Sequence, residues 1–281
     1  MTRLLVIGGS DAGISAALRA QELDPRAEVS VLLADEYPNY SICGLPFYLS
    51  GETPDHRLLA HRTAFNGIEI LTNRRAVSIH PAEKRVDVVR GANGRAQTMR
   101  YDHLIIATGA VPVRPQGLSG LDLSGVYFLH IMADSFAVHH HLTMGDARSA
   151  LIVGAGYIGV EMAAALRHRG IDVTLVSRTD PVFPTVDPEF GTLIGEELSR
   201  HGVRVVAGSA VENIKTTGSR RGLAVSGSSG FSASADLVLV ATGVRPDTSL
   251  AVAGGDCAGA LGRDPSHATH GDHDPRNRGR G

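Results

Sequence analysis

The stretch Leu4-Leu5-Val6-Ile7-Gly8-Gly9-Ser10-Asp11-Ala12-Gly13 decides the fold of this chain. Its four leading apolar residues have the length of a buried parallel strand. The glycines after them permit a tight turn, and the small residues of 14–20 are expected to continue as a helix. A further apolar run at 29–33 is the next expected strand. A strand, a glycine loop, a helix and a strand in this order predict a dinucleotide-binding unit.

The chain contains a second copy of this pattern. Residues 151–153 are again an apolar strand, and Gly154-Ala155-Gly156-Tyr157-Ile158-Gly159 follows them. A helix expected at 160–169 and a strand expected at 171–176 complete the second copy. Two copies in one chain are stronger support for nucleotide binding than either glycine loop alone.

Two apolar strands that end in Ala-Thr-Gly, at 104–109 and 237–243, support the duplication because one follows each glycine loop. Two short segments between each loop and its Ala-Thr-Gly strand are expected to form turn-linked strands. These are 76–79 and 85–89 after the first loop, and 204–206 and 223–225 after the second. Residues 110–125, rich in Pro and Gly, are the expected linker, and 133–142 the helix that leads into the second unit. The prediction is an α/β fold with two Rossmann-like units of the three-layer ββα type, the second inserted in the first. The expected boundaries are 1–112, 113–250 and a tail at 251–281.

Composition restricts the classes of function. A length of 281 residues corresponds to about two domains, at roughly 150 residues each. A net charge of −2 gives no electrostatic reason to expect a nucleic-acid or membrane partner. The apolar runs are too short for a signal segment or a membrane span, so we expect a soluble cytoplasmic protein. Two cysteines exclude a disulfide scaffold and favour a reducing compartment.

The second glycine loop has the spacing that a pyrophosphate requires. Gly154 allows the tight turn, Gly156 the close approach of the backbone to the phosphates, and Gly159 the packing of helix on strand. The backbone N–H groups near Tyr157 and Ile158 are expected to face the phosphates.

The residue that meets the ribose in this second unit is expected after the strand at 171–176. Ser177 and Arg178 stand there, without the carboxylate that NAD recognition uses. The cation of Arg178 favours a 2′-phosphate, so we expect NADPH rather than NADH.

The first loop departs from the pattern. Ser10 replaces the middle glycine, and Leu33 stands where a ribose-binding carboxylate is usual. Asp35 is the nearest substitute, since its distance from Gly13 is close to the ~20 residues expected. In the alternative interpretation, Asp35 only starts a turn.

Cys43 is the candidate for redox chemistry. It lies in Ser41-Ile42-Cys43-Gly44-Leu45-Pro46-Phe47-Tyr48-Leu49-Ser50-Gly51, near an expected helix start. A thiolate there could attack a disulfide or be oxidised reversibly to a sulfenate. The alternative is a buried cysteine that packs as a small apolar residue.

Together, the two glycine loops, the two Ala-Thr-Gly strands and the Cys43 segment resemble the pyridine nucleotide–disulfide oxidoreductases. Within that family, the chain is similar to the single-cysteine branch of coenzyme A disulfide reductase, NADH oxidase and NADH peroxidase, over about residues 3–250. The resemblance implies FAD at the first loop, NAD(P)H at the second, and Cys43 as the redox centre beside the flavin. It implies that Glu161 is the acidic residue near the nicotinamide; otherwise it is an exposed carboxylate of the first helical turn. The expected cofactor-binding residues are Gly8, Gly9, Ser10, Gly13, Asp35, Thr108, Gly109, Gly154, Gly156, Tyr157, Ile158, Gly159, Ser177, Arg178 and Gly243.

The departures from the family pattern bear on the reaction. Asp11 stands where oxidase and peroxidase members carry a catalytic His, which favours a disulfide-reductase-like activity on a small-molecule or disulfide acceptor.

We expect no metal site. Adjacent side chains on a helix point in different directions, so His139, His140 and His141 are expected to lie on a solvated helix face.

The tail is unlike the family. Residues 262–281 contain Ala268 as the single apolar side chain among many Arg, Asp, His, Pro and Gly, so we expect the tail to be disordered. The family's C-terminal interface domain, which builds its homodimer, is expected to be absent. A shifted reading frame is a second hypothesis, because the permitted codons can encode a segment similar to the family's next strand. Two alternatives to a cysteine-dependent enzyme stay open: a catalytically dead nucleotide-binding fragment, and a ferredoxin- or rubredoxin-reductase-like flavoprotein that needs no cysteine.

Overall fold

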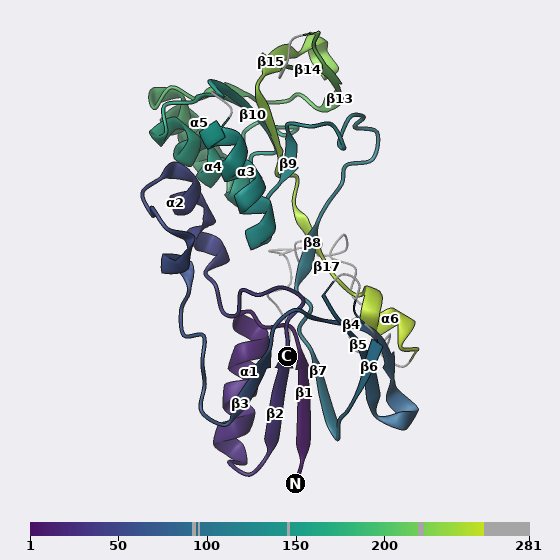
Figure 1. Ribbon diagram of the computed structural model, residues 1–281. Coiled ribbons are helices and arrows are strands. Elements are labelled where there is room, and N and C mark those ends of the chain that lie inside the picture. The colour runs from purple at the N-terminus through teal and green to yellow at the C-terminus, as the bar shows by residue number, and fades with distance from the viewer. Residues whose placement is uncertain (92–93, 95, 145–146, 219–221, 256–281) are drawn as a thin grey trace, which may run out of the picture.

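The first unit is built on a parallel sheet with the strand order β3-β2-β1-β7, shown in the lower half of Figure 1. In this computed structural model, residues 1–91, 94, 96–144, 147–218 and 222–255 are described. The sheet strands are β1 (Arg3–Ile7), β2 (Glu28–Leu32), β3 (Ile68–Leu71) and β7 (His103–Ile106). Helix α1 (Asp11–Leu23) covers one face. An antiparallel sheet of β4 (Arg74–His80), β5 (Arg85–Arg90) and β6 (Ala96–Arg100) covers the other.

The alternation of side chains along β1 produces these three layers. Leu4 and Val6 join the cluster that contains Ile14 of α1. Leu5 and Ile7 point the opposite way and join the cluster of the antiparallel sheet. Both faces of the strand are therefore buried, as a continuous apolar run predicts.

The second unit repeats the arrangement around a parallel sheet with the order β12-β11-β10-β16-β9. Its strands are β9 (Val126–Phe128), β10 (Ser149–Val153), β11 (Asp172–Val176), β12 (Arg204–Val206) and β16 (Leu237–Val240). Helices α3 (Met132–Met144), α4 (Tyr157–His168) and α5 (Pro188–Arg200) lie on one face. The antiparallel strands β13 (Val211–Thr216), β14 (Leu223–Gly227) and β15 (Ser232–Ala235) lie on the other. The predicted α/β fold with two three-layer units is confirmed.

One short segment differs from its expected place. Residues 204–206 were expected to correspond to the small turn-linked strands, but β12 is a parallel edge strand of the second main sheet, paired with β11. The reason is the length of the connection: α5 lies between the two strands, and a helical crossover returns the chain parallel to the strand it left.

Two antiparallel strands connect the units. They are β8 (Ala110–Pro112), which occupies the first three residues of the expected linker, and β17 (Val244–Pro246). After β17 the chain returns to the first unit, where α6 (Ser249–Ala253) places Leu250 against the antiparallel sheet. The second unit is therefore inserted in the first. Residues 251–255, the start of the expected tail at 251–281, instead finish α6 and its turn. The rest of that tail lies outside the described residues, including 262–281, on which the expected disorder and the reading-frame hypothesis rest.

The remaining elements are short. Helix α2 (Leu45–Ser50) follows the 3₁₀ turn η1 (Ile42–Gly44), and three further 3₁₀ turns are η2 (His56–Leu59), η3 (Pro81–Glu83) and η4 (Ser228–Gly230). Although α2 follows the first glycine loop in the chain, it lies beside α3 and α4 of the second unit (Figure 1).

Candidate functional site

Four glycines of the two loops are required by the packing of the chain itself. Gly8 and Gly154 have φ values of +118° and +107°, and a Cβ on them would lie 2.0 Å from the carbonyl oxygen of Ala107 and 2.3 Å from that of Ala241. A Cβ on Gly13 or Gly159 would lie 1.9 Å from the carbonyl oxygen of the first glycine in its own loop. These contacts explain why each glycine loop is accompanied by an Ala-Thr-Gly strand: its alanine closes over the turn.

Gly156 is different, because no packing contact among the described residues requires a glycine at this position. Its φ of −89° is open to any residue, and a Cβ there would meet no atom within 4 Å. Gly156 is the N-cap of α4, whose first N–H groups lack helical partners. Open space in front of a helix N-terminus fits a pyrophosphate.

The first loop has the same shape with more polar side chains. Ser10 is the N-cap of α1 and its hydroxyl makes no capping hydrogen bond. Ser10 and Asp11 are exposed at this helix end. Gly9 is close to the side chain of Leu33, at 3.1 Å from its would-be Cβ. A phosphate at this loop would meet the carboxylate of Asp11 as well as the helix N–H groups.

Asp35 does start a turn. Its Oδ1 accepts a hydrogen bond of 2.9 Å from the Tyr37 N–H, and its carbonyl accepts one of 2.7 Å from the Asn73 N–H. Asp35 is half-buried, and this burial raises the pKa of its carboxyl. The turn role that sequence left as an alternative is present; contact with a ribose stays a prediction.

Ser177 and Arg178 follow β11, at the carboxyl end of the second sheet. Ser177 is buried and its hydroxyl is engaged within its own turn, 3.0 Å from the Thr179 hydroxyl, while it accepts the Thr179 N–H at 3.2 Å. Arg178 is exposed, and among the described residues no hydrogen bond or ion pair joins it. Its guanidinium is free to meet a ligand at this strand end.

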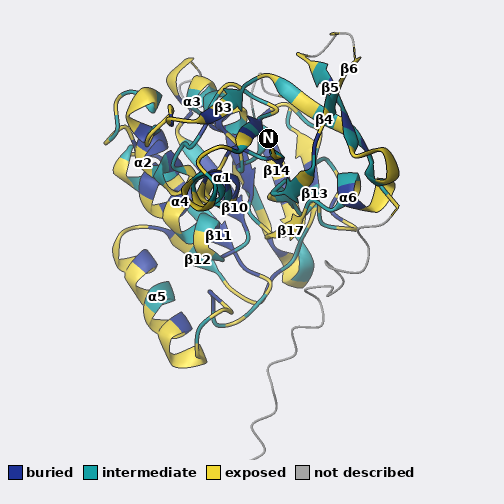
Figure 2. Ribbon diagram, turned by 90° about the horizontal axis from the view of Figure 1, so that it is seen from below, coloured by how far each residue is buried: buried dark blue, intermediate teal, exposed yellow. Residues whose placement is uncertain are grey.

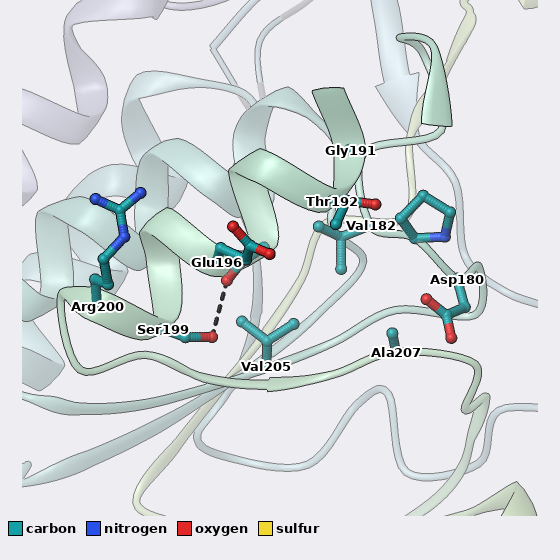
Figure 3. Close-up of a pocket in the computed structure, with 11 residues that line it drawn as sticks. Asp180, Val182, Gly191, Thr192, Glu196, Ser199, Arg200, Val205 and Ala207 are labelled. Atoms are coloured by element: carbon teal, nitrogen blue, oxygen red, sulfur yellow. Dashed lines mark hydrogen bonds between the residues drawn. The ribbon is translucent and has the colours of Figure 1, made fainter. Parts of the chain in front are cut away.

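A cavity of about 530 Å³ lies beside this strand end and was not predicted from sequence. Figure 3 shows it between α5, the loop at Asp180 and the strand at Val205, with Glu196 on the helix side. Its lining comes from three separate stretches of chain, so no local motif marks it. Figure 2 shows how little of α5 is buried.

Cys43 lies in η1 and is exposed, so it is not a buried packing residue. The segment before it is joined to the first glycine loop, because the Asn39 N–H donates to the Gly9 carbonyl at 2.8 Å. The segment after it is joined to the second unit, because Arg169 Nη1 donates to the Leu49 carbonyl at 3.0 Å. The thiol therefore lies in residues 39–49, a segment that is joined to both units and that we call the strap.

The other predicted residues have these places. Glu161 is exposed and is the fifth residue of α4, which puts it beyond the first turn. Thr108 donates its hydroxyl to the Asp247 carbonyl at 2.6 Å, where the chain returns to the first unit. Gly109 and Gly243 have φ values of +73° and +108°, and a Cβ on either would meet nothing within 4 Å. These three residues border the crossing between the units.

The expectation of a solvated histidine face is wrong for two of the three histidines. His139 stacks on Tyr48 with ring centroids 4.7 Å apart, and His141 Nδ1 lies 3.0 Å from the Tyr127 hydroxyl. His140 alone is exposed. The face is covered because α2 and β9 pack against it, which the helix sequence does not reveal.

The described residues contain neither a candidate metal site nor a candidate membrane-spanning helix. Among them, no group of three or more His, Cys, Asp or Glu side chains is arranged to hold a metal ion. Within the same residues, no helix is both long enough and apolar enough to cross a membrane.

Comparison with known proteins matches residues 2–273 to the family model described as pyridine nucleotide-disulphide oxidoreductase. An NAD(P)H sulfur oxidoreductase (CoA-dependent) of Pyrococcus furiosus is 30% identical over 263 residues, which are 89% of this chain and 55% of that protein. The chain therefore spans about half the length of the curated relatives it matches. Other matches are named coenzyme A disulfide reductase, NADH oxidase and a ferredoxin reductase subunit.

Solved structures give the same result. Reduced CoADR-RHD of Bacillus anthracis has a TM-score of 0.84 and 30% identity, and the match covers 90% of this chain and 46% of the other chain. An NAD-dependent persulfide reductase from A. fulgidus has a TM-score of 0.83 and 33% identity, and covers 90% of this chain and 48% of its own. The relatives are named as oxidoreductases, and both structural matches extend over both units.

Proposed function

This chain belongs to the pyridine nucleotide-disulphide oxidoreductase family, and we propose that it is an FAD- and NAD(P)H-dependent oxidoreductase whose redox centre is Cys43. Its acceptor is a disulfide or a similar small molecule. FAD, when bound, supplies two-electron transfer between the nicotinamide and the thiol. One observation carries the proposal: an exposed cysteine lies on a strap joined to both glycine-loop units, through Gly9 on one side and Arg169 on the other.

The residues present fit the two dinucleotides. The first loop, with Gly8, Gly13 and the α1 N-terminus, would hold the FAD pyrophosphate, and Asp35 its ribose. The second loop would hold the NAD(P)H pyrophosphate over Gly156. Arg178, exposed and unpaired among the described residues, supports NADPH, because a guanidinium can bind a 2′-phosphate by two hydrogen bonds.

Cys43 does the chemistry at the acceptor. Its thiolate attacks one sulfur of the acceptor disulfide, a mixed disulfide forms, and the second sulfur leaves as a thiolate. Two electrons, which bound FAD would pass on from NAD(P)H, would then break the mixed disulfide. The Cys43 thiolate would be restored, and the acceptor's other sulfur would take up a proton and leave as a thiol. Exposure of the thiol leaves a path for a small acceptor to reach it.

Two other functions have support. Open space in front of the α4 N-terminus at Gly156 also fits a catalytically dead fragment that binds nucleotide without turnover. A matched ferredoxin reductase subunit, 32% identical over 249 residues, favours transfer to a protein acceptor without a cysteine. The exposed Cys43 favours the main proposal over transfer without a cysteine.

Replacing Cys43 by Ser tests the proposal. The purified protein is expected to be yellow, and NADPH is expected to bleach its flavin absorbance without oxygen faster than NADH does. Cys43→Ser is expected to keep this bleaching and to lose disulfide reduction, because only the acceptor step needs the thiol.

Each alternative predicts a different result in the same assay. A colourless protein that binds NADPH would support the fragment. Disulfide or ferredoxin reduction that Cys43→Ser leaves unchanged would overturn the cysteine mechanism.

A further inference from the structure

Helix α2, which follows Cys43, belongs to the hydrophobic core of the second unit. Leu45, Tyr48 and Leu49 are buried, and Leu49 has no exposed surface. They share one cluster with Met162 and Leu166 of α4, whereas the two first-unit clusters contain no residue of α2. The place of α2 is therefore determined mainly by packing on the second unit.

A guanidinium of the second unit closes the end of α2. Arg169, the C-cap residue of α4, donates from Nη1 to the carbonyl of Leu49 at 3.0 Å. Leu49 lies in the last turn of α2, where carbonyls lack helical partners and where a cation is favourable. This single contact both caps the helix and joins it to α4.

Helix α3, the other neighbour of α2, contacts it through an aromatic stack. The His139 ring of α3 lies on the Tyr48 ring with an interplanar angle of 16°. Burial, with the charge of Arg169 nearby, lowers the pKa of His139, so the stacked imidazole is neutral at neutral pH. Phe136, one turn earlier on α3, meets the rings of Tyr37 and His56 edge-on.

We propose that Arg169 and His139 are positioning residues that set the location of the Cys43 thiol from the second unit. They hold α2 through the Leu49 carbonyl and the Tyr48 ring. The opposite end of the strap is held on the first glycine loop by Asn39. This inference rests on the proposed redox role of Cys43.

Helix α4 connects the expected nucleotide site with the contact that holds α2. It begins at the N-cap Gly156, where the nucleotide pyrophosphate is expected, and ends at Arg169. One helix of 12 residues therefore separates the expected nucleotide site from the contact that holds the cysteine helix. A hydrogen-bonded helix of this length keeps the distance between its two ends constant.

The test compares Arg169→Gln with Arg167→Gln in the full chain. Arg167 lies on the same helix, but its contacts are with Ile171, Asp172 and His201 of the second unit. The first variant is expected to speed hydrogen exchange of the α2 amides about tenfold, the effect of losing a bond to a charged donor. Arg167→Gln is expected to leave the exchange of α2 unchanged.

Turnover provides a second readout. Arg169→Gln is expected to lower kcat for disulfide reduction while the KM for NADPH stays within about twofold, and Arg169→Lys to restore part of kcat. His139→Phe, which keeps a stacking ring, is expected to behave like the unmodified chain, and His139→Ala like Arg169→Gln.

Each outcome separates this inference from the proposed function. Unchanged α2 exchange in both Arg169→Gln and His139→Ala would overturn the inference, even if Cys43→Ser abolishes disulfide reduction. Faster α2 exchange in a protein without disulfide reduction would leave the positioning contact intact and overturn the role of Cys43.

Discussion

Gly156 and Gly159, three residues apart in one loop, are glycines for different physical reasons that the structure separates. Gly159 has a carbonyl oxygen 1.9 Å from its would-be Cβ, so a methyl group has no space there. Gly156 has open space, so a methyl group harms only what would bind in front of the helix.

The two Gly→Ala substitutions are therefore expected to differ. Gly159→Ala should destabilise the fold by about 1–3 kcal/mol, as overpacking does, and Gly156→Ala should leave thermal unfolding unchanged. Gly156→Ala should instead weaken NADPH binding at least about tenfold, measured by nucleotide fluorescence on the folded protein. Equal losses of stability in both variants would contradict this assignment.

The sequence predicts single residues well where a local pattern marks them, and poorly where their surroundings come from distant parts of the chain. The spacing of the glycine loops was sufficient to predict the turns at Gly8, Gly13, Gly154 and Gly159, because each loop lies between an apolar strand and a helix. The carbonyl oxygens that exclude a side chain at Gly8 and Gly154 belong to the distant Ala107 and Ala241. The burial of His139 under Tyr48 was not predictable, because the two residues are far apart in the chain.

Asp236 shows how one carboxylate organises the start of two neighbouring strands. It precedes β16 and accepts the backbone N–H groups of Arg148 and Ser149, each at 2.9 Å, at the beginning of β10. Burial alone would raise its pKa, but these hydrogen bonds and the one from the Ser149 hydroxyl lower the pKa from the ordinary value for Asp.

A lowered pKa in the folded state gives a defined dependence of stability on pH. The contribution is complete above the unfolded pKa of about 4 and is lost as the pH falls through the lower folded value. Asp236→Asn should cost about 1.5 kcal/mol near pH 7, and the difference from the unmodified chain should shrink below about pH 4. Urea unfolding across this range measures it, with the exposed Asp172→Asn as control. A pH-independent difference would count against the charge of Asp236.

At the scale of elements, the strands with continuous apolar runs were predictable and the short connections were not. β1 and β10 are buried on both faces, which leaves a strong pattern in the sequence. β12 has only three residues, and its parallel partner is separated from it by α5, so its sheet could not be read locally. The position of α2 likewise depends on residues more than eighty positions away.

On the scale of the whole molecule, the boundary in sequence is not the boundary in space. Residues 45–50 belong to the first unit by chain order, yet they fill the core of the second. The two units should therefore depend on each other for stability.

Leu49→Ala is the direct check. Removal of this fully buried side chain should cost about 2–5 kcal/mol, and the loss should appear as faster hydrogen exchange in α4 of the second unit. Val6→Ala, in the core of the first unit, should affect β1 and β2 first. If Leu49→Ala left α4 exchange unaltered, the shared core would not be coupling the units.

The crossing formed by β8 and β17 has a mechanical consequence once α2 is considered with it. The paired strands β8 and β17 form one hinge between the units, about which the second unit could rotate. Helix α2 contacts the second unit to one side of that hinge (Figure 1). Because the second unit is held both at the β8–β17 crossing and at α2, it cannot rotate about the crossing alone. Any opening between the two units must begin by breaking the contacts of α2, the helix that follows Cys43.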